Sequence, residues 1–319
     1  MLDRLKFIPS RLLQAVPVAF GVTIIVFFMV HLLPGTPAVA ILGQTATPER
    51  VAALSEKLGL NEPLWKQYVL FLGHLVTGDL GQSITYGRPV SQLVLQAIPV
   101  TLSLLLYALV LSLVISVPLA ALAASKPGRS QDLGVRVFTL LGQGMPQFWV
   151  GIMLILLLAV KVHAFPVGGY GETATDHLFY LFLPALTLAL AMTPTTIRSL
   201  RASTITVLGS DYVGTARSKG LAGTTLFRKH VLRNAAIPTV SIVGVNLGYL
   251  VGGSLVIEKV FAIPGLGSLM VNSIFSRDFP TIQAVALFVA LFVVVVGILT
   301  DVVYTAIDPR VDLSSRELA

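Results

Sequence analysis

The chain has 319 residues, of which 55% are hydrophobic and only 12% are charged, with a formal net charge of +7. Soluble domains carry about 25% charged residues, so this composition indicates an integral membrane protein. The chain has no cysteine, which excludes disulfides, thiolate nucleophiles and cysteine metal sites. In a membrane protein, positive charge marks cytoplasmic loops and does not by itself indicate a nucleic-acid partner.

Six apolar segments are long enough to cross a bilayer, which takes about 20 residues of helix. They are 12–33, 97–124, 135–162, 178–198, 236–257 and 282–306. Barrel strands alternate over about ten residues, and these runs are longer and more evenly apolar than that. The expected fold is therefore an all-α membrane protein with six transmembrane helices.

The N-terminal part divides into two predicted segments. Residues 1–33 hold a short cytoplasmic segment and the first span, and residues 34–95 form the largest outer segment. The basic start, the apolar stretch and Ala38-Val39-Ala40 also fit a signal peptide with its cleavage site. A stretch of about 22 apolar residues is long enough to span, which favours a retained helix and leaves cleavage within residues 1–40 as the alternative.

Inside the outer segment, one amphipathic helix is predicted over 48–76. Thr47 is a suitable N-cap and Pro48 a suitable first helical residue. The string Gly78-Asp79-Leu80-Gly81 ends this helix. Further along the chain, 258–281 contains Pro264-Gly265-Leu266-Gly267 and predicts a short re-entrant or surface helix.

Residues 96–307 form a predicted five-helix core, and 308–319 form a cytoplasmic tail. With the N-terminus inside, 15 of the 22 lysines and arginines fall on the inner side. This distribution places both termini and the long loop 199–235 in the cytoplasm.

The third and fourth spans carry residues that suggest a passage. Gly142, Gly144 and Pro146 weaken the third helix and favour a break there. Polar side chains inside spans are costly and often functional. The candidates for a polar pathway are Gln143, Gln147, Thr193 and Asn246. For each of them, the alternative is a hydrogen bond to a neighbouring helix.

The loop 199–235 is basic and has helical patterning. Asp211 is expected to begin a first short helix, where its negative charge meets the positive helix end. Gly220 is expected to stop it, because glycine adopts the left-handed backbone easily. A second short helix is predicted from about 223 to 234. Such a pair of helices is suited to a groove in a partner protein; the alternative is a solvated loop that only fixes topology.

In the fifth span, Gly244, Gly248 and Gly252 recur at every fourth residue. This spacing makes a smooth ridge that lets another helix approach closely. The partner helix belongs either to the same chain or to another membrane subunit, and a third alternative is a wider pathway for a bulky substrate.

The string from Gly214 through Ala216 to Gly220, followed nine residues later by His230-Val-Leu232-Arg233, resembles the EAA loop of binding-protein-dependent ABC transporter permeases. Ala216, Gly220 and the spacing to Leu232 match that pattern. Gly214, Thr215 and Arg233 depart from it. The amino-acid sequence of the loop is similar to that of the peptide and nickel permease branch.

The resemblance to this branch extends over nearly the whole chain. The matching strings are HLLPGTP at 31–37, GDLGQS at 78–83, PQFWVG at 146–151, EKVFAIPGLG at 258–267, RDFP at 277–280 and DPR at 308–310. The GDLG-x-S string resembles the first of the two permeases of that branch.

The resemblance implies a type I ABC importer permease fold with cytoplasmic coupling helices, in the plasma membrane of a bacterium or archaeon. It implies a second homologous permease, two ATP-binding subunits that hold ATP and Mg, and an extracytoplasmic binding protein. It also assigns ATPase coupling to the loop. The residues concerned are Asp211, Ala216, Arg217, Lys219, Gly220, Leu221, Arg228, Lys229, His230, Leu232 and Arg233.

The function that follows is a permease for oligopeptides or dipeptides, with ATP hydrolysis in separate subunits because this chain has no Walker A string. The alternative within transport is nickel or another small solute. A membrane-embedded enzyme would need a reactive pair at one depth, and a passive channel or scaffold would not need an EAA-like loop. The scattered histidines have no metal-ligand spacing, so no metal or cofactor site is expected in this chain.

Overall fold

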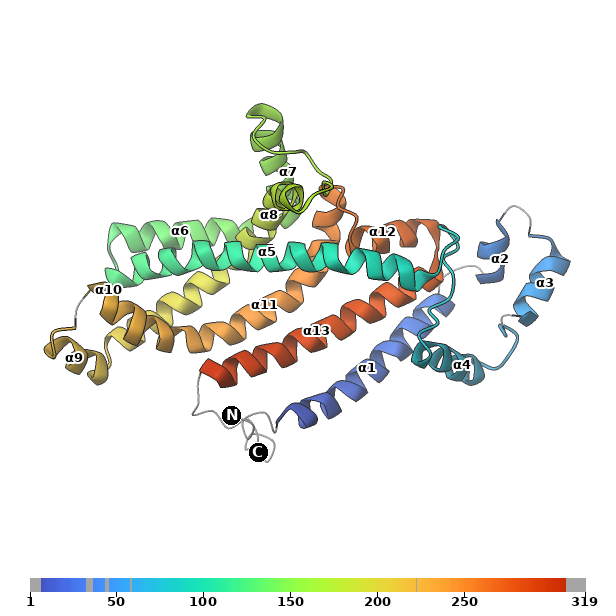
Figure 1. Ribbon diagram of the computed structural model, residues 1–319, viewed down its shortest axis with the longest axis horizontal. Helices are drawn as coiled ribbons and strands as arrows, with labels where there is room; N and C mark the ends of the chain where they lie inside the picture. Colours follow the sequence, from blue (N-terminus) through green and yellow to red (C-terminus); the bar gives the residue numbers. More distant parts are fainter. Residues whose placement is uncertain (1–6, 33–36, 44–45, 58, 222, 308–319) are drawn as a thin grey trace. The chain divides into compact units, whose positions relative to one another are not determined.

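The protein is helical in the part of the chain that the computed structural model describes, residues 7–32, 37–43, 46–57, 59–221 and 223–307. The chain divides into two compact units. Unit 1 contains Leu102–Ile263 and the end of the last helix from Val295 onward, and unit 2 contains Leu12–Thr101 and Pro264–Val294. Figure 1 shows the order of the helices along the chain.

Unit 2 holds the short helices of the outer segment. These are α2 (Pro37–Leu42), α3 (Pro48–Lys57) and α4 (Leu64–Val76). Unit 2 also holds the short helix α12 (Leu266–Ser276). The helix α12 lies inside the segment predicted to hold a short re-entrant or surface helix. Unit 2 also contains most of α1 (Phe7–Leu32) and the first part of α5 (Val90–Ser125).

The prediction of one helix over 48–76 is wrong, because α3 and α4 are separated by a turn. Gly59 has a φ of +67°, which favours glycine and ends the first helix. The N–H of Leu60 donates to the carbonyl of Ser55 at 2.8 Å. The start of α3 is as predicted: Thr47 accepts a bond from the N–H of Arg50 at 3.4 Å, with Pro48 at the first helical position.

Four helices are long and apolar enough to cross a membrane within the described residues: α5, α8 (Ala174–Leu208), the helix from His230 to Val260, and α13 (Phe279–Ile307). A bent helix pair raises the count to five. The first predicted span lies on α1, where the described apolar stretch is Val16–Phe28. Helix α1 as a whole has 26 residues, which is long enough for a span. The described residues therefore show four or five of the six predicted spans.

The third predicted span is broken at the place where the sequence favoured a break. Helix α6 (Ser130–Gly144) and helix α7 (Gln147–Leu154) with the π-helix η3 (Ile155–Lys161) are bent by 104°. Met145 is extended (φ −91°, ψ 129°), as expected for a residue before proline. Pro146 then precedes α7, where its missing N–H costs no helical hydrogen bond.

The loop predicted at 199–235 is largely helical, and its first third is not a loop. Helix α8 continues to Leu208, because Leu200 and Thr204 are buried on one face of the segment 199–208, in which half of the residues are apolar. After Gly209 and Ser210 comes α9 (Asp211–Ser218). The second predicted helix, 223–234, is not separate: α10 (Gly223–Leu226) and the π-helix η4 (Phe227–Leu232) run directly into α11 (Arg233–Val260).

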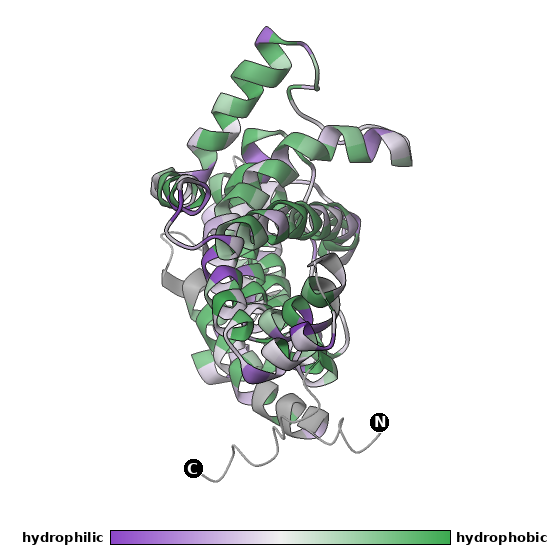
Figure 2. Cartoon of the chain, turned by 90° about the vertical axis from the view of Figure 1, so that its left-hand side faces the viewer, coloured by the Kyte–Doolittle hydropathy of each residue, from purple (hydrophilic) through white to green (hydrophobic). Residues whose placement is uncertain are grey.

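Hydrophobic residues, coloured green in Figure 2, make up most of the long helices. Leu106, Leu140 and Tyr249 are 63%, 71% and 77% exposed, respectively. A soluble helix exposes its polar face and buries one apolar stripe. Helices that are apolar all round are suited to lipid or to a neighbouring membrane subunit.

Candidate functional site

Helix α9 is held on unit 1 by one apolar face. Val213 and Ala216, one turn apart, are 1% and 8% exposed. They pack in a cluster with Leu226 and Val231 of the segment that follows and with Val207 at the end of α8. The burial of this small core explains why an eight-residue helix, too short to be stable alone, has a defined position.

The other face of α9 presents charge. Asp211, Arg217 and Lys219 are all exposed. Asp211 stands at the first position of the helix and Arg217 in its last turn, where each charge opposes the adjacent end of the helix dipole. The sequence therefore shapes α9 as an amphipathic helix with an apolar base and a charged outer face.

Gly220 closes α9. Its φ is +84°, a conformation that side chains with a Cβ adopt only with strain. The N–H of Gly220 donates to Arg217 at 3.0 Å, and the N–H of Leu221 donates to Ala216 at 3.1 Å. These bonds satisfy carbonyls at the helix end, so the predicted helix stop at Gly220 is found.

The remaining coupling candidates are Leu221, which follows Gly220, and residues of η4 and the first residue of α11. His230, Leu221 and Leu232 are half-buried and Arg233 is exposed. Leu232 packs against the cluster described below for the ends of the long helices. The side chains of Arg228 and Lys229 lie outside the described residues, so their predicted role in ion pairing stays a prediction.

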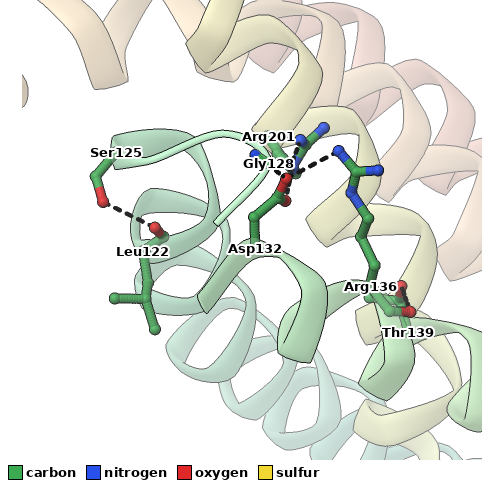
Figure 3. Close-up of polar contacts among 7 residues, drawn as sticks. All are labelled: Leu122, Ser125, Gly128, Asp132, Arg136, Thr139 and Arg201. Atoms are coloured by element: carbon green, nitrogen blue, oxygen red, sulfur yellow. Dashed lines mark hydrogen bonds and ion pairs between the residues drawn. The ribbon is translucent and has the colours of Figure 1, made fainter. Parts of the chain in front are cut away.

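A buried carboxylate joins α6 to α8, and this site was not predicted. Asp132, in the first turn of α6, accepts two bonds from Arg201 of α8: Nε to Oδ1 at 2.6 Å and Nη2 to Oδ2 at 2.8 Å. Oδ2 also accepts from Nη2 of Arg136 at 2.8 Å and from the N–H of Gly128 at 2.9 Å. Figure 3 shows the carboxylate between the two guanidinium groups.

The two arginines differ in burial. The side chain of Asp132 is 1% exposed, that of Arg201 is 18% exposed, and that of Arg136 is 58% exposed. A two-bond pair between a guanidinium and a carboxylate fixes geometry as well as charge. Arg201 therefore supplies the buried, directional partner, and Arg136 adds a bond from the solvent side. The Asp132/Arg136 spacing of four residues was a visible signal, but the partner on α8 was not.

Apolar packing surrounds this ion pair. Val135 of α6 packs with Ile197 and Leu200 of α8, and with Ala120 and Ala123 of α5. Further along α6, a Cβ at Gly142 would lie 3.2 Å from the Pro194 ring. Helices α6 and α8 are thus closely packed as far as Gly142, two residues before the end of α6.

Unit 2 contains a second buried carboxylate, again at a helix junction. Asp278, fully buried between α12 and α13, accepts a bond from the Ser83 hydroxyl and from the N–H groups of Ile84 and Thr85 at 3.2 and 3.4 Å. The Thr85 hydroxyl donates to Ser276 at 2.8 Å. The two matching strings at 78–83 and 277–280 therefore meet in space, which their separation of nearly 200 residues concealed.

The four pathway candidates do not come together. Gln143 accepts a bond from Arg198 at 2.6 Å, and Asn246 donates to Thr195 at 2.8 Å. Thr193 is fully buried and donates to the carbonyl of Ala189 in its own helix. Gln147 is half-buried and its carbonyl lies against Gly253 of α11. Their role in a pathway stays a prediction.

A groove of about 450 Å³ lies in unit 1 between α5, α8, α11 and α13. It is lined by leucines, valines and threonines, including Leu113, Leu200 and Val243. The four pathway candidates are not among its lining residues.

The three glycines of the predicted ridge have different surroundings. A Cβ at Gly244 would overlap the side chain of Thr300 on α13 of the same chain. Gly252 has open space around it, and Gly248 is half-buried. Within this chain, close helix approach accounts for Gly244 and not for Gly252.

The geometry described so far is that of a membrane-embedded helical bundle with an amphipathic helix, α9, seated on the ends of its long helices. Residues 116–313 match the family of binding-protein-dependent transport system inner membrane components, and residues 4–105 match its N-terminal region. The chain belongs to this family of transport permeases and is a multi-pass membrane component.

Relatives match along almost the full length. The chain is 38% identical over 312 residues to the oligopeptide transport system permease protein AppB of Bacillus subtilis, covering 96% of this chain and 99% of that protein. It is 33% identical to the dipeptide permease DppB of Alkalihalophilus pseudofirmus and 37% identical to the glutathione permease GsiC of Escherichia coli. Each of these comparisons covers 96% of this chain and 99% of the relative.

Among solved structures, the chain is similar to an inward-facing structure of the MetNI methionine ABC transporter. The TM-score is 0.57 at 18% identity, with 68% of this chain and 97% of that chain covered. This likeness supports the fold of a type I ABC importer permease.

Proposed function

We propose that this chain is the permease subunit of an ATP-driven importer for oligopeptides or dipeptides, and that α9 is the contact through which separate ATPase subunits move it. The observation that carries the proposal is α9 itself. Its apolar side is buried on the ends of α8 and η4, while Asp211, Arg217 and Lys219 face outward. An amphipathic helix presented in this way is suited to a groove in a partner.

The peptide substrate is supported by the relatives named above, which carry oligopeptides, dipeptides and glutathione. The nickel alternative draws no support from them. In this proposal, a second homologous permease completes the pathway and an extracytoplasmic binding protein delivers the substrate. ATP and Mg are held by the two ATPase subunits.

The orientation of the chain in the membrane is inferred from the basic loop. Because lysine and arginine concentrate on the cytoplasmic side of membrane proteins, α9 and both termini are assigned to the cytoplasm of a bacterium or archaeon. The proposal keeps the predicted division of the chain. It consists of the N-terminal segment with the first span (1–33), the extracytoplasmic segment (34–95), the five-helix core (96–307) and the cytoplasmic tail (308–319).

The test is charge reversal on the outer face of α9, in the importer reconstituted with its ATPase subunits and binding protein in liposomes. The double variant Arg217→Glu/Lys219→Glu is expected to lose co-purification of the ATPase and ATP-dependent uptake of a labelled dipeptide or pentapeptide. Lys161→Glu is the matched control, since Lys161 is also exposed but ends η3. It is expected to bind and transport as the unchanged protein does.

Gly220→Pro gives a second test of the same contact. Proline holds φ near −65°, which is incompatible with the φ of +84° at this position. We expect ATP hydrolysis to become uncoupled from uptake. Uptake that is normal after both the charge reversal and the proline substitution would contradict the proposal, as would uptake of nickel and not peptide.

A further inference from the structure

We propose that Asp132 is a positioning residue for the transport movement, which locks the first turn of α6 to the end of α8 so that displacement of α9 reaches the bend at Met145–Pro146. This inference rests on the proposed function, in which ATPase subunits move α9. The ion pair between Asp132 and Arg201 is the link that the sequence did not predict.

The first part of the link runs from α9 to α8. The end of α8 and α9 are separated only by Gly209 and Ser210. Val207 and Leu208 of α8 pack against the buried face of α9, so a force on α9 acts directly on the last two turns of α8. Arg201 stands on α8 seven residues before its last residue, Leu208.

The second part runs from α8 to α6. Arg201 binds both carboxylate oxygens of Asp132, at 2.6 and 2.8 Å. The apolar packing of Val135 against Leu200 holds the two helices together through dispersion contacts, each of which is weak and has no fixed direction. Two parallel hydrogen bonds to a buried carboxylate have a fixed geometry. The ion pair therefore prevents sliding of one helix along the other at the end of α6 nearest to α9.

The third part runs along α6 to the bend. Helix α6 is continuous from Ser130 to Gly144 and is bent by 104° from α7 immediately afterwards. Near the bend, Gln143 accepts a bond from Arg198 of α8. Arg198 and Arg201 thus hold α6 at both ends from a single turn of α8. A movement of that turn is transmitted to the bend without being absorbed in between.

The experiment compares two pairs of charges around one carboxylate. Asp132→Asn/Arg201→Gln removes the buried pair while retaining similar shapes, and Arg136→Gln removes only the exposed partner. Each variant is reconstituted with its ATPase subunits and binding protein, and peptide imported per ATP hydrolysed is measured. A variant that is merely unstable loses both rates together, whereas a coupling defect lowers the ratio.

We expect the double variant to import about tenfold less peptide per ATP, within the range of typical coupling energies between sites. Arg136→Gln is expected to stay within about twofold, because exposed pairs contribute little. Arg201→Lys retains the charge but not the two-bond geometry. If this variant folds and imports less peptide per ATP, the two-bond geometry is required and charge alone is not sufficient.

A second readout does not depend on the ATPase. Because the chain has no cysteine, spin labels can be attached at Gln131→Cys on α6 and Ser218→Cys on α9, both of which are exposed. The distance distribution between the labels is expected to be narrow in the unchanged protein and in Arg136→Gln, and broad in the double variant.

The two proposals fail in different ways. If the unchanged protein shows no ATP-dependent peptide import, the proposed function is overturned. If it imports peptide and the double variant retains the same import per ATP, or the same narrow label distance, the assignment of Asp132 is overturned and the proposed function stands.

Discussion

The two units each bury one aspartate at a junction between helices, and they satisfy it in different ways. In unit 1, Asp132 accepts bonds mainly from the long side chains of Arg201 and Arg136. In unit 2, Asp278 accepts bonds from one short hydroxyl, that of Ser83, and from backbone N–H groups. The first arrangement links two helices through opposite charges. The second fixes the path of one loop.

This difference indicates different tasks. The two bonds between a guanidinium and a carboxylate have a fixed geometry that keeps two helices together as they move, and the opposite charges oppose their separation. Backbone donors in a turn hold a carboxylate only if the turn itself keeps its shape. We therefore interpret the Asp132 junction as part of a moving link and the Asp278 junction as a static closure of the outer segment.

The largest loss of folding stability is expected from Asp132→Ala. Its removal leaves the largely buried Arg201 without its buried counter-charge, and breaking a buried pair in this way costs about 3–5 kcal/mol. Thermal unfolding of the purified permease in detergent measures the loss. Replacing both partners, as in Asp132→Asn/Arg201→Gln, should restore part of it. If Asp132→Ala is as stable as the unchanged protein, the buried ion pair does not link α6 to α8 as described.

A smaller loss is expected from Asp278→Ala. The Ser83 hydroxyl and the N–H groups of Ile84 and Thr85 would lose their acceptor, at a cost of about 1–3 kcal/mol when such groups stay buried. Limited proteolysis between residues 77 and 89 should reveal local opening. If cleavage there is unchanged and cleavage near α9 increases instead, the two junctions would not be independent.

Packing between α6 and α8 gives a third test of the link. Gly142→Leu would press on Pro194, and overpacking of this kind costs about 1–3 kcal/mol. Gly134→Leu on the same helix is the control, because a Cβ there meets nothing within 4 Å. Leucine favours helix over glycine by up to about 1 kcal/mol, so the control should be neutral or stabilising in the same unfolding assay. Equal losses at both positions would refute close packing at Gly142.

The smallest effect is expected from Arg136→Gln. The side chain is 58% exposed, and exposed ion pairs contribute about 0–1 kcal/mol. Raising the salt concentration should reduce even this difference. A loss as large as that of Asp132→Ala would mean that Arg136, and not Arg201, is the main partner of the carboxylate.

Local patterns in the sequence determined much of this protein. The apolar runs predicted the long helices, Thr47 and Pro48 predicted the start of α3, and Gly220 predicted the end of α9. Each of these depends on residues within a few positions of one another. Gly142, Gly144 and Pro146 likewise predicted the break of the third span, where the residue before the proline is extended.

Three features were decided only by tertiary structure. Helix α8 continues to Leu208 because α9 and α11 pack against its end, although 199–208 was predicted to belong to the loop. Asp132 meets Arg201 across 69 residues, and Ser83 meets Asp278 across 195. Hydropathy and helix propensity are properties of neighbours along the chain, so the sequence by itself determined where most of the long helices form. Which charges pair, and which polar segments are buried, depended on how those helices pack.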